Sequence, residues 1–179
     1  MGYDDKVKDQ VSGSKGLIER ITLYIPFYSG YRKKNTARDV DREVRYGIIR
    51  IMKGVKIDLE AVHREVVLGG DMDLARNVER IRTKTDTHCT RIEKAANGYS
   101  GIFATMKVKD EELDAVIEWD AKILEGADDL RKLMENVRNA AEDGEDIKKM
   151  LRNLENIIDD LMEQYAQRDK VLKGLADGE

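Results

Sequence analysis

Two short motifs in this chain combine residue types that bind metals or carry out catalysis. Glu60 and His63 form Glu-x-x-His, the motif with which di-iron helical bundles present a carboxylate and an imidazole from adjacent helix turns. Such a centre needs a second copy, but the other histidine, His88, has Thr85 in place of the acidic residue. The helix pairing expected below also separates the two histidines by about 18 Å, at about 1.5 Å per residue. The sequence therefore predicts no metal site.

His88 is followed directly by Cys89, a pair of residue types that serve as base and nucleophile in cysteine proteases. Consecutive helical residues point about 100° apart, so these two side chains cannot act on each other directly. Asp120 could pair with His88, but no nucleophile accompanies them. The simpler interpretation is that Cys89 is a small apolar filler and His88 a hydrogen-bonded edge or core polar group. A polar layer of Thr85, His88 and Asp120 that fixes the helix register is also compatible with the pattern.

The common catalytic and cofactor-binding loops are absent from the sequence. It contains no Gly-x-Gly-x-x-Gly, no Walker loop, no Cys-x-x-Cys and no Gly-x-Ser-x-Gly, each of which supplies a defined piece of binding or catalytic chemistry. We therefore predict a protein that is not an enzyme, with no catalytic residue and no cofactor.

The segment from Leu17 to Arg45 joins aromatic residues to basic ones. The residues that we predict to form a binding site here are Tyr28, Tyr31, Arg32, Lys33, Arg38, Arg42 and Arg45. Two other interpretations remain. The aromatic residues could fasten a short helix to the rest of the protein while the cations pair with acidic helices. Alternatively, the same residues could contact an anionic membrane surface or stack on single-stranded nucleic acid.

A long apolar stripe positions this segment. Its members are Val40, Val44, Ile48, Ile51, Val55, Leu59, Val62 and Val66. Their spacing repeats every eleven residues, which corresponds to about 3.67 residues per turn, so the stripe runs nearly straight along one long helix. Asn35 or Thr36 could cap the start of this helix, and Gly69-Gly70 ends it.

The remaining pattern predicts an all-α, elongated antiparallel bundle of four long helices. Residues 1–16 form a flexible tail, and residues 17–179 form a single helical-bundle domain that begins with a short amphipathic helix ended by Pro26. Two αα-hairpins follow, one over about 32–98 and one over about 109–174, and the first helix of the second hairpin starts at Asp110 and ends near Glu142-Asp143-Gly144.

Composition and charge limit where the protein can reside and which kinds of partner it can bind. The chain of 179 residues is 41% hydrophobic and 38% charged and has a single cysteine, which suits a reducing interior, so we predict a cytoplasmic protein. Its longest apolar stretch is too short to span a membrane, and its start lacks a signal-peptide core. Residues 1–94 carry 20 Lys and Arg against 15 Asp and Glu, whereas residues 95–179 carry 12 against 21.

A sequence resemblance rests on two short segments: Gly30-Tyr31-Arg32-Lys33-Lys34, followed by Arg38, Asp41, Arg42 and Arg45, and later Gly98-Tyr99-Ser100-Gly101. They resemble an uncharacterised family of prokaryotic, largely helical cytoplasmic proteins in which a Gly-Tyr-basic sequence starts a long helix. Asn35 and Thr36 depart from the family's more strongly charged start. The resemblance implies the fold and the compartment but no reaction. The high charge content and the three glutamines are compatible with an archaeal source.

These observations predict a non-enzymatic interaction or scaffold protein. Its partner would be another protein or a second copy of the chain, bound along the long apolar stripes. The alternative is a peripheral binder of anionic membranes or nucleic acid that uses residues 17–45, although the net charge of −4 disfavours nonspecific binding to nucleic acid. No small-molecule substrate is evident.

Overall fold

Four long helices make up most of the protein. The computed structural model describes residues 16–26, 28, 34–98 and 110–177. The long helices are α2 (Lys34–Leu68), α3 (Met72–Gly98), α5 (Asp110–Glu142) and α6 (Lys148–Asp177), and residues 16–22 form a short helix before them. The predicted all-α class is confirmed for the described residues. Of the predicted tail over 1–16, residues 1–15 lie outside them, and Gly16 begins the short helix.

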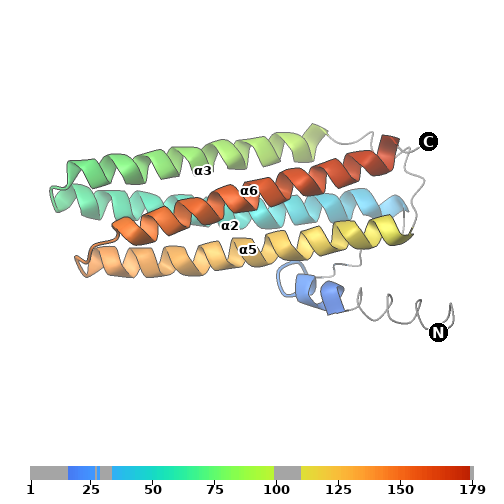
Figure 1. Ribbon diagram of the computed structural model, residues 1–179, viewed down its shortest axis with the longest axis horizontal. Coiled ribbons are helices and arrows are strands. Elements are labelled where there is room, and N and C mark those ends of the chain that lie inside the picture. The colour runs from blue at the N-terminus through green and yellow to red at the C-terminus, as the bar shows by residue number, and fades with distance from the viewer. Residues whose placement is uncertain (1–15, 27, 29–33, 99–109, 178–179) are drawn as a thin grey trace.

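The four helices pack side by side into an elongated bundle. Helix α2 packs against α3 and α5, α5 packs against α6, and α3 and α6 approach each other less closely. Figure 1 shows the α2–α3 and α5–α6 turns together at one end of the bundle, and the C-terminus at the other. We call these the turn end and the open end. The prediction of a bundle of four long helices is confirmed.

The interior is built from apolar stripes at helical spacing. On α2, seven of the eight predicted stripe residues are buried, and the exception is Ile51, which is only half-buried. Met52 is fully buried in its place, because Ile48, Met52, Val55 and Leu59 follow the 4-3-4 spacing that keeps one face of a helix on the core.

Glycine ends the helices at both turns. Gly70 and Gly144 have φ of 82° and 73°, a left-handed conformation that strains any residue with a Cβ. The next helices start from aspartate: Asp71 Oδ1 accepts a 2.9 Å hydrogen bond from the backbone N–H of Leu74, and Asp146 Oδ1 accepts one of 3.0 Å from that of Lys148. The predicted ends of α2 and α5 are therefore close to the observed ones, whereas the side chains of Asn35 and Thr36 lie outside the described residues.

The short N-terminal helix is attached to the side of the bundle. It ends earlier than the predicted 17–25, because the N–H groups of Leu23 and Tyr24 bond carbonyls three residues back, which tightens the last turn. Ile25 packs over Gly47, where an added Cβ would lie 3.5 Å from the Ile25 side chain. Arg20 donates two hydrogen bonds to Glu125 of α5, of 2.7 and 2.6 Å.

Ion pairs bridge the wider seam between α3 and α6. Arg80 Nη2 donates to Glu155 Oε2 at 2.6 Å, and Lys84 Nζ donates to Glu155 Oε1 at 3.1 Å and to Asp159 Oδ2 at 2.7 Å. The hydrogen bond from Arg80 is the main cause that lowers the pKa of Glu155 to about 2; burial opposes it and Lys84 adds to it. Long side chains thus connect two helices whose backbones stay apart.

Two glycine variants should change stability in opposite directions. Gly54→Ala, in the exposed middle of α2 with open space around the new Cβ, should raise the free energy of unfolding by about 0.8 kcal/mol, because alanine favours helix. Gly70→Ala should lower it by about 1 kcal/mol or more, because of the positive φ. Urea unfolding followed by circular dichroism measures both, and a stabilising Gly70→Ala would contradict the turn geometry.

The α3–α6 bridge should make stability acid-sensitive. The pKa of Glu155 is lowered in the folded state, so its contribution is present above the ordinary glutamate pKa and is lost as pH falls from about 5 to about 2. We expect Glu155→Gln to lower the free energy of unfolding at neutral pH by about 1 kcal/mol. The variant should also lack the decrease in the free energy of unfolding that the protonation of Glu155 causes in acid. Urea unfolding between neutral and acid pH checks this. Exposed Glu163→Gln on the same helix is the control, and identical pH profiles for the two variants would exclude the bridge.

Candidate functional site

Four charged side chains occupy core positions toward the open end of the bundle. Arg45, Asp120 and Arg168 are fully buried, and Asp41 is 3% exposed. Asp41 and Arg45 continue the spacing of Ile48 on α2, so the helix turns them inward with its apolar residues. Buried charges are tolerated only when they are paired and hydrogen-bonded, so the partners of these groups decide what they can do. We call this set, with the residues bonded to it, the buried charge network.

Arg168 of α6 connects three helices. Its Nε donates to Asp120 Oδ1 of α5 at 2.5 Å, and its Nη1 donates to Asp41 Oδ1 of α2 at 2.7 Å. Helices α2 and α6 lack direct backbone packing over the described residues. A single guanidinium therefore joins elements that the backbone keeps apart.

Arg45 forms the second half of the network. Its Nε donates to Asp41 Oδ2 at 2.8 Å and its Nη2 to Asp169 Oδ1 at 2.8 Å. Its Nη1 donates to the hydroxyl of Tyr165, and the guanidinium carbon lies 5.3 Å from the centre of that ring. Asp41 thus accepts from two guanidinium groups, one on each carboxylate oxygen.

Tyr28 brings the N-terminal segment into the network. The ring is 5% exposed, and its hydroxyl donates to Asp120 Oδ2 at 2.8 Å. Asp120 therefore accepts one hydrogen bond from α6 and another from the segment that precedes α2. Together with the Arg20 to Glu125 pair, this bond attaches the segment to α5 at two points.

The electrostatics of the network favour the ionised form of Asp41. Burial by itself raises the pKa of Asp41, but the charges and hydrogen bonds of Arg168 and Arg45 outweigh it, so the pKa is held below its usual value. A carboxylate with a lowered pKa is a weak proton acceptor near neutral pH. The arrangement therefore suits holding helices together better than moving protons.

Of the seven predicted binding residues, two are buried, one is exposed, and four have side chains outside the described residues. Tyr28 and Arg45 lie inside the protein as members of the buried charge network. Arg42 is exposed, and its guanidinium carbon lies 5.5 Å from the ring centre of Tyr46. Tyr31, Arg32 and Lys33, and the side chain of Arg38, lie outside the described residues. For Tyr28 and Arg45, the observed placement matches the interpretation in which aromatic residues fasten the N-terminal segment and cations pair with acidic helices.

Arg168, Tyr165 and Asp169 were not identified as site residues from the sequence. The spacing of Leu154, Ile158, Leu161, Tyr165, Arg168 and Leu172 places Arg168 within an apolar stripe. An arginine at such a position indicates a buried partner, and the i,i+4 pair of Asp41 and Arg45 gives a similar indication on α2. These two signals were available in the sequence.

The predicted polar layer of Thr85, His88 and Asp120 is wrong. Asp120 bonds Tyr28 and Arg168, while α3 and α5 lie diagonally across the bundle without packing against each other over the described residues. The Thr85 hydroxyl donates to the Ile81 carbonyl of its own helix at 2.8 Å. His88 Nε2 is buried without a hydrogen-bond partner among the described residues, and burial, with help from Lys84, lowers the pKa of His88.

Cys89 is buried beside these residues, and burial raises the pKa of its thiol. A thiol must lose its proton to act as a nucleophile. The environment of Cys89 therefore disfavours its reactive form.

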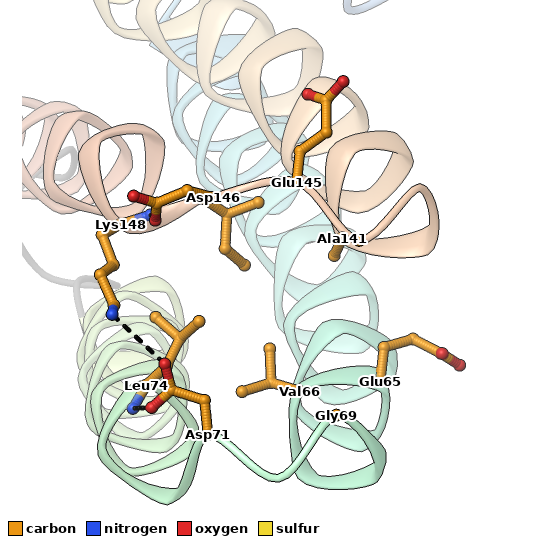
Figure 2. Close-up of a pocket in the computed structure, with 11 residues that line it drawn as sticks. Glu65, Val66, Gly69, Asp71, Leu74, Ala141, Glu145, Asp146 and Lys148 are labelled. Atoms are coloured by element: carbon orange, nitrogen blue, oxygen red, sulfur yellow. Dashed lines mark hydrogen bonds and ion pairs between the residues drawn. The ribbon is translucent and has the colours of Figure 1, made fainter.

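A pocket of about 310 Å³ lies at the turn end, between the two connecting turns. Val66, Leu74, Ala141 and Ile147 supply its apolar side chains. Figure 2 shows Val66 and Leu74 facing each other across it, with the Glu65 and Glu145 carboxylates directed away from it. The two turns are linked at its edge, where Lys148 Nζ lies 3.3 Å from Asp71 Oδ2.

Comparisons with known proteins found no match: no family model, no curated protein and no solved structure is similar to this chain at the threshold applied. Within residues 16–26, 28, 34–98 and 110–177, no helix is long and apolar enough to cross a membrane. The same part of the chain holds no group of three or more histidine, cysteine or acidic residues placed to bind a metal ion.

Removing the central cation of the buried charge network should be strongly destabilising. Arg168→Met should lower the free energy of unfolding by about 3 to 5 kcal/mol, because Asp41 and Asp120 would stay buried without their shared cation. Arg152→Met, at an exposed position of the same helix, should change it by about 0.5 kcal/mol or less. Urea unfolding measures both, and similar small effects would show that the network is dispensable.

Proposed function

We propose that the protein is a non-enzymatic interaction module that binds another protein through the turn end of its bundle. The partner segment presents a large apolar side chain flanked by lysine or arginine. The single observation that carries this proposal is an apolar pocket with exposed apolar residues beside it and acidic residues around it.

Exposed apolar side chains concentrate at the turn end. Val67 is 40% exposed, Leu68 81% and Met72 56%, and they flank the Gly69-Gly70 turn. These are three of the five large apolar side chains that are exposed among the described residues. Apolar surface gathered at one place on an otherwise charged protein favours protein binding. The adjoining pocket is large enough for an anchoring side chain.

Charge at the same end selects the partner. The pocket is edged by Glu65, Asp71, Glu145 and Asp146, and by one cation, Lys148, which is paired with Asp71. The surplus of carboxylates attracts a basic segment and repels an acidic one. Complementary charge and an apolar anchor therefore point to the same kind of partner.

We further infer that the two helix pairs form antiparallel hairpins. Lys53 bonds Glu93 and Lys56 bonds Asp86, so residues further along α2 meet residues earlier in α3. Such hairpins, held together by the buried charge network, would provide a firm support for the turn end. A second copy of the chain is a less suitable partner, because its own turn end would bring like charges together.

The aromatic and basic segment supports its predicted role less well. Arg45 is neutralised inside the protein, and of the seven residues Arg42 is the one whose exposed side chain the structure describes. Binding of an anionic membrane or nucleic acid therefore stays a prediction, as do the cytoplasmic location and the family resemblance.

A labelled helical peptide of leucine and lysine tests the proposal. We expect saturable binding in fluorescence anisotropy, weakened about tenfold or more in the double variant Leu68→Ser, Met72→Ser. The loss of two apolar contacts costs about 1.5 kcal/mol or more, and about 1.4 kcal/mol corresponds to a tenfold change in affinity. Ile57→Ser is the matched control, since Ile57 is 63% exposed on α2 away from the turns. A peptide of leucine and glutamate should bind more weakly.

Three results would contradict the proposal: equal affinity of the double variant and the parent protein, equal binding of the acidic peptide, or absence of saturable binding. Circular dichroism of each variant confirms that it is folded. Raising the salt concentration should weaken binding without abolishing it, because salt screens charge but not apolar contact.

A further inference from the structure

A second hollow, of about 440 Å³, lies between α2 and α5 and shares no lining residue with the pocket at the turn end. Helix α2 contributes Arg50, Ile51 and Gly54 to it, and α5 contributes Arg131 and Arg138. Three guanidinium groups from two helices therefore surround one depression. The volume lies within the range of small-molecule sites.

The shape of the hollow comes from two residues of α2. Apart from Gly54 itself, its chain neighbours and the adjoining backbone of α2, no heavy atom lies within 4 Å of the place that a Cβ of residue 54 would occupy. Ile51 is half-buried and left at the surface by the register that turns Met52 inward. Together they leave an open, uncharged floor between the arginines.

The three arginines differ in how many hydrogen bonds and ion pairs their guanidinium groups form with described residues. Arg50 is exposed and has no hydrogen bond or ion pair with any residue that the structure describes. Arg138 Nη1 donates to Asp58 Oδ1 at 3.2 Å, and its Nε is buried without a hydrogen-bond partner among the described residues, although Glu142 Oε1 lies 3.8 Å from it. Arg131 is held by Asp128 of its own helix, with an N to O distance of 2.9 Å.

Two carboxylates also line the hollow, so its lining residues carry one net positive charge. Asp128 and Glu142, which are not part of the lining, also pair with Arg131 and Arg138. Asp58 holds Arg138, and Glu135 lies 4.0 Å from Arg131. Each orients an arginine of α5 and neither is paired with Arg50. The acidic residues thus position two cations and leave the third available.

We propose that this hollow binds a small organic phosphate. A guanidinium group donates two parallel hydrogen bonds to a phosphate, and Arg50 and Arg138 both have donors to spare. The apolar floor of Ile51 and Gly54 would contact the organic part. This site is independent of the turn end, so it does not depend on the proposed protein interaction.

Isothermal titration calorimetry of the full chain at low salt tests the site with pyrophosphate, adenosine monophosphate and adenosine. We expect the two phosphates to bind and adenosine, which lacks the anion, not to bind. Arg50→Ala should weaken phosphate binding about tenfold or more, as expected for the loss of a charge-assisted hydrogen bond. Arg50→Lys keeps the positive charge but loses the two parallel donors of the guanidinium group. Its affinity for phosphate should lie between that of the parent protein and that of Arg50→Ala.

Two further variants separate a formed site from general attraction to positive charge. Gly54→Leu should fill the hollow and weaken binding of adenosine monophosphate more than that of pyrophosphate. Arg152→Ala, an exposed arginine of α6 without an ion pair among the described residues, should leave both affinities unchanged. Failure of both phosphates to bind would overturn the proposal, as would equal weakening by Arg50→Ala and Arg152→Ala. A variant that loses phosphate binding should still bind the leucine and lysine peptide.

Discussion

The packing of this bundle depends on one buried guanidinium, that of Arg168. Burying an arginine is costly unless its charge is met by carboxylates in good geometry. Arg168 meets this condition by bonding Asp41 of α2 and Asp120 of α5 at the same time. The relative placement of α2, α5 and α6 is therefore constrained at this end, because a shift of any one of them would break an ion pair between buried charges.

The N-terminal segment is subject to the same constraint. Tyr28 reaches the second oxygen of Asp120, so the carboxylate that receives Arg168 also holds the segment that precedes α2. Apolar contacts at Ile21 and Ile25 and the Arg20 to Glu125 pair add to this attachment. An ion pair that orients three helices thereby also fixes where the chain enters the bundle.

Exposed apolar side chains and an arginine without an ion pair among the described residues lie at the surface. At the turn end, Leu68 and Met72 are exposed beside an apolar pocket, and between α2 and α5 Arg50 faces a hollow without an acidic partner. The charged interior, by contrast, is paired by short hydrogen bonds. This difference is the physical basis for assigning binding to the surface features and support to the buried charge network.

Much of the fold followed from the sequence by itself, because helix periodicity and helix ends are local properties. The stripe of α2, the glycines at 70 and 144, and the start of α5 at Asp110 all depend on residues within a few turns of each other. The partners of Asp120 and Arg168 and the open hollow beside Gly54 were decided only by the tertiary structure. Each depends on which side chain of another helix lies opposite, and residues such as Asp120 and Arg168, 48 positions apart, carry no mark of that pairing in their own neighbourhoods.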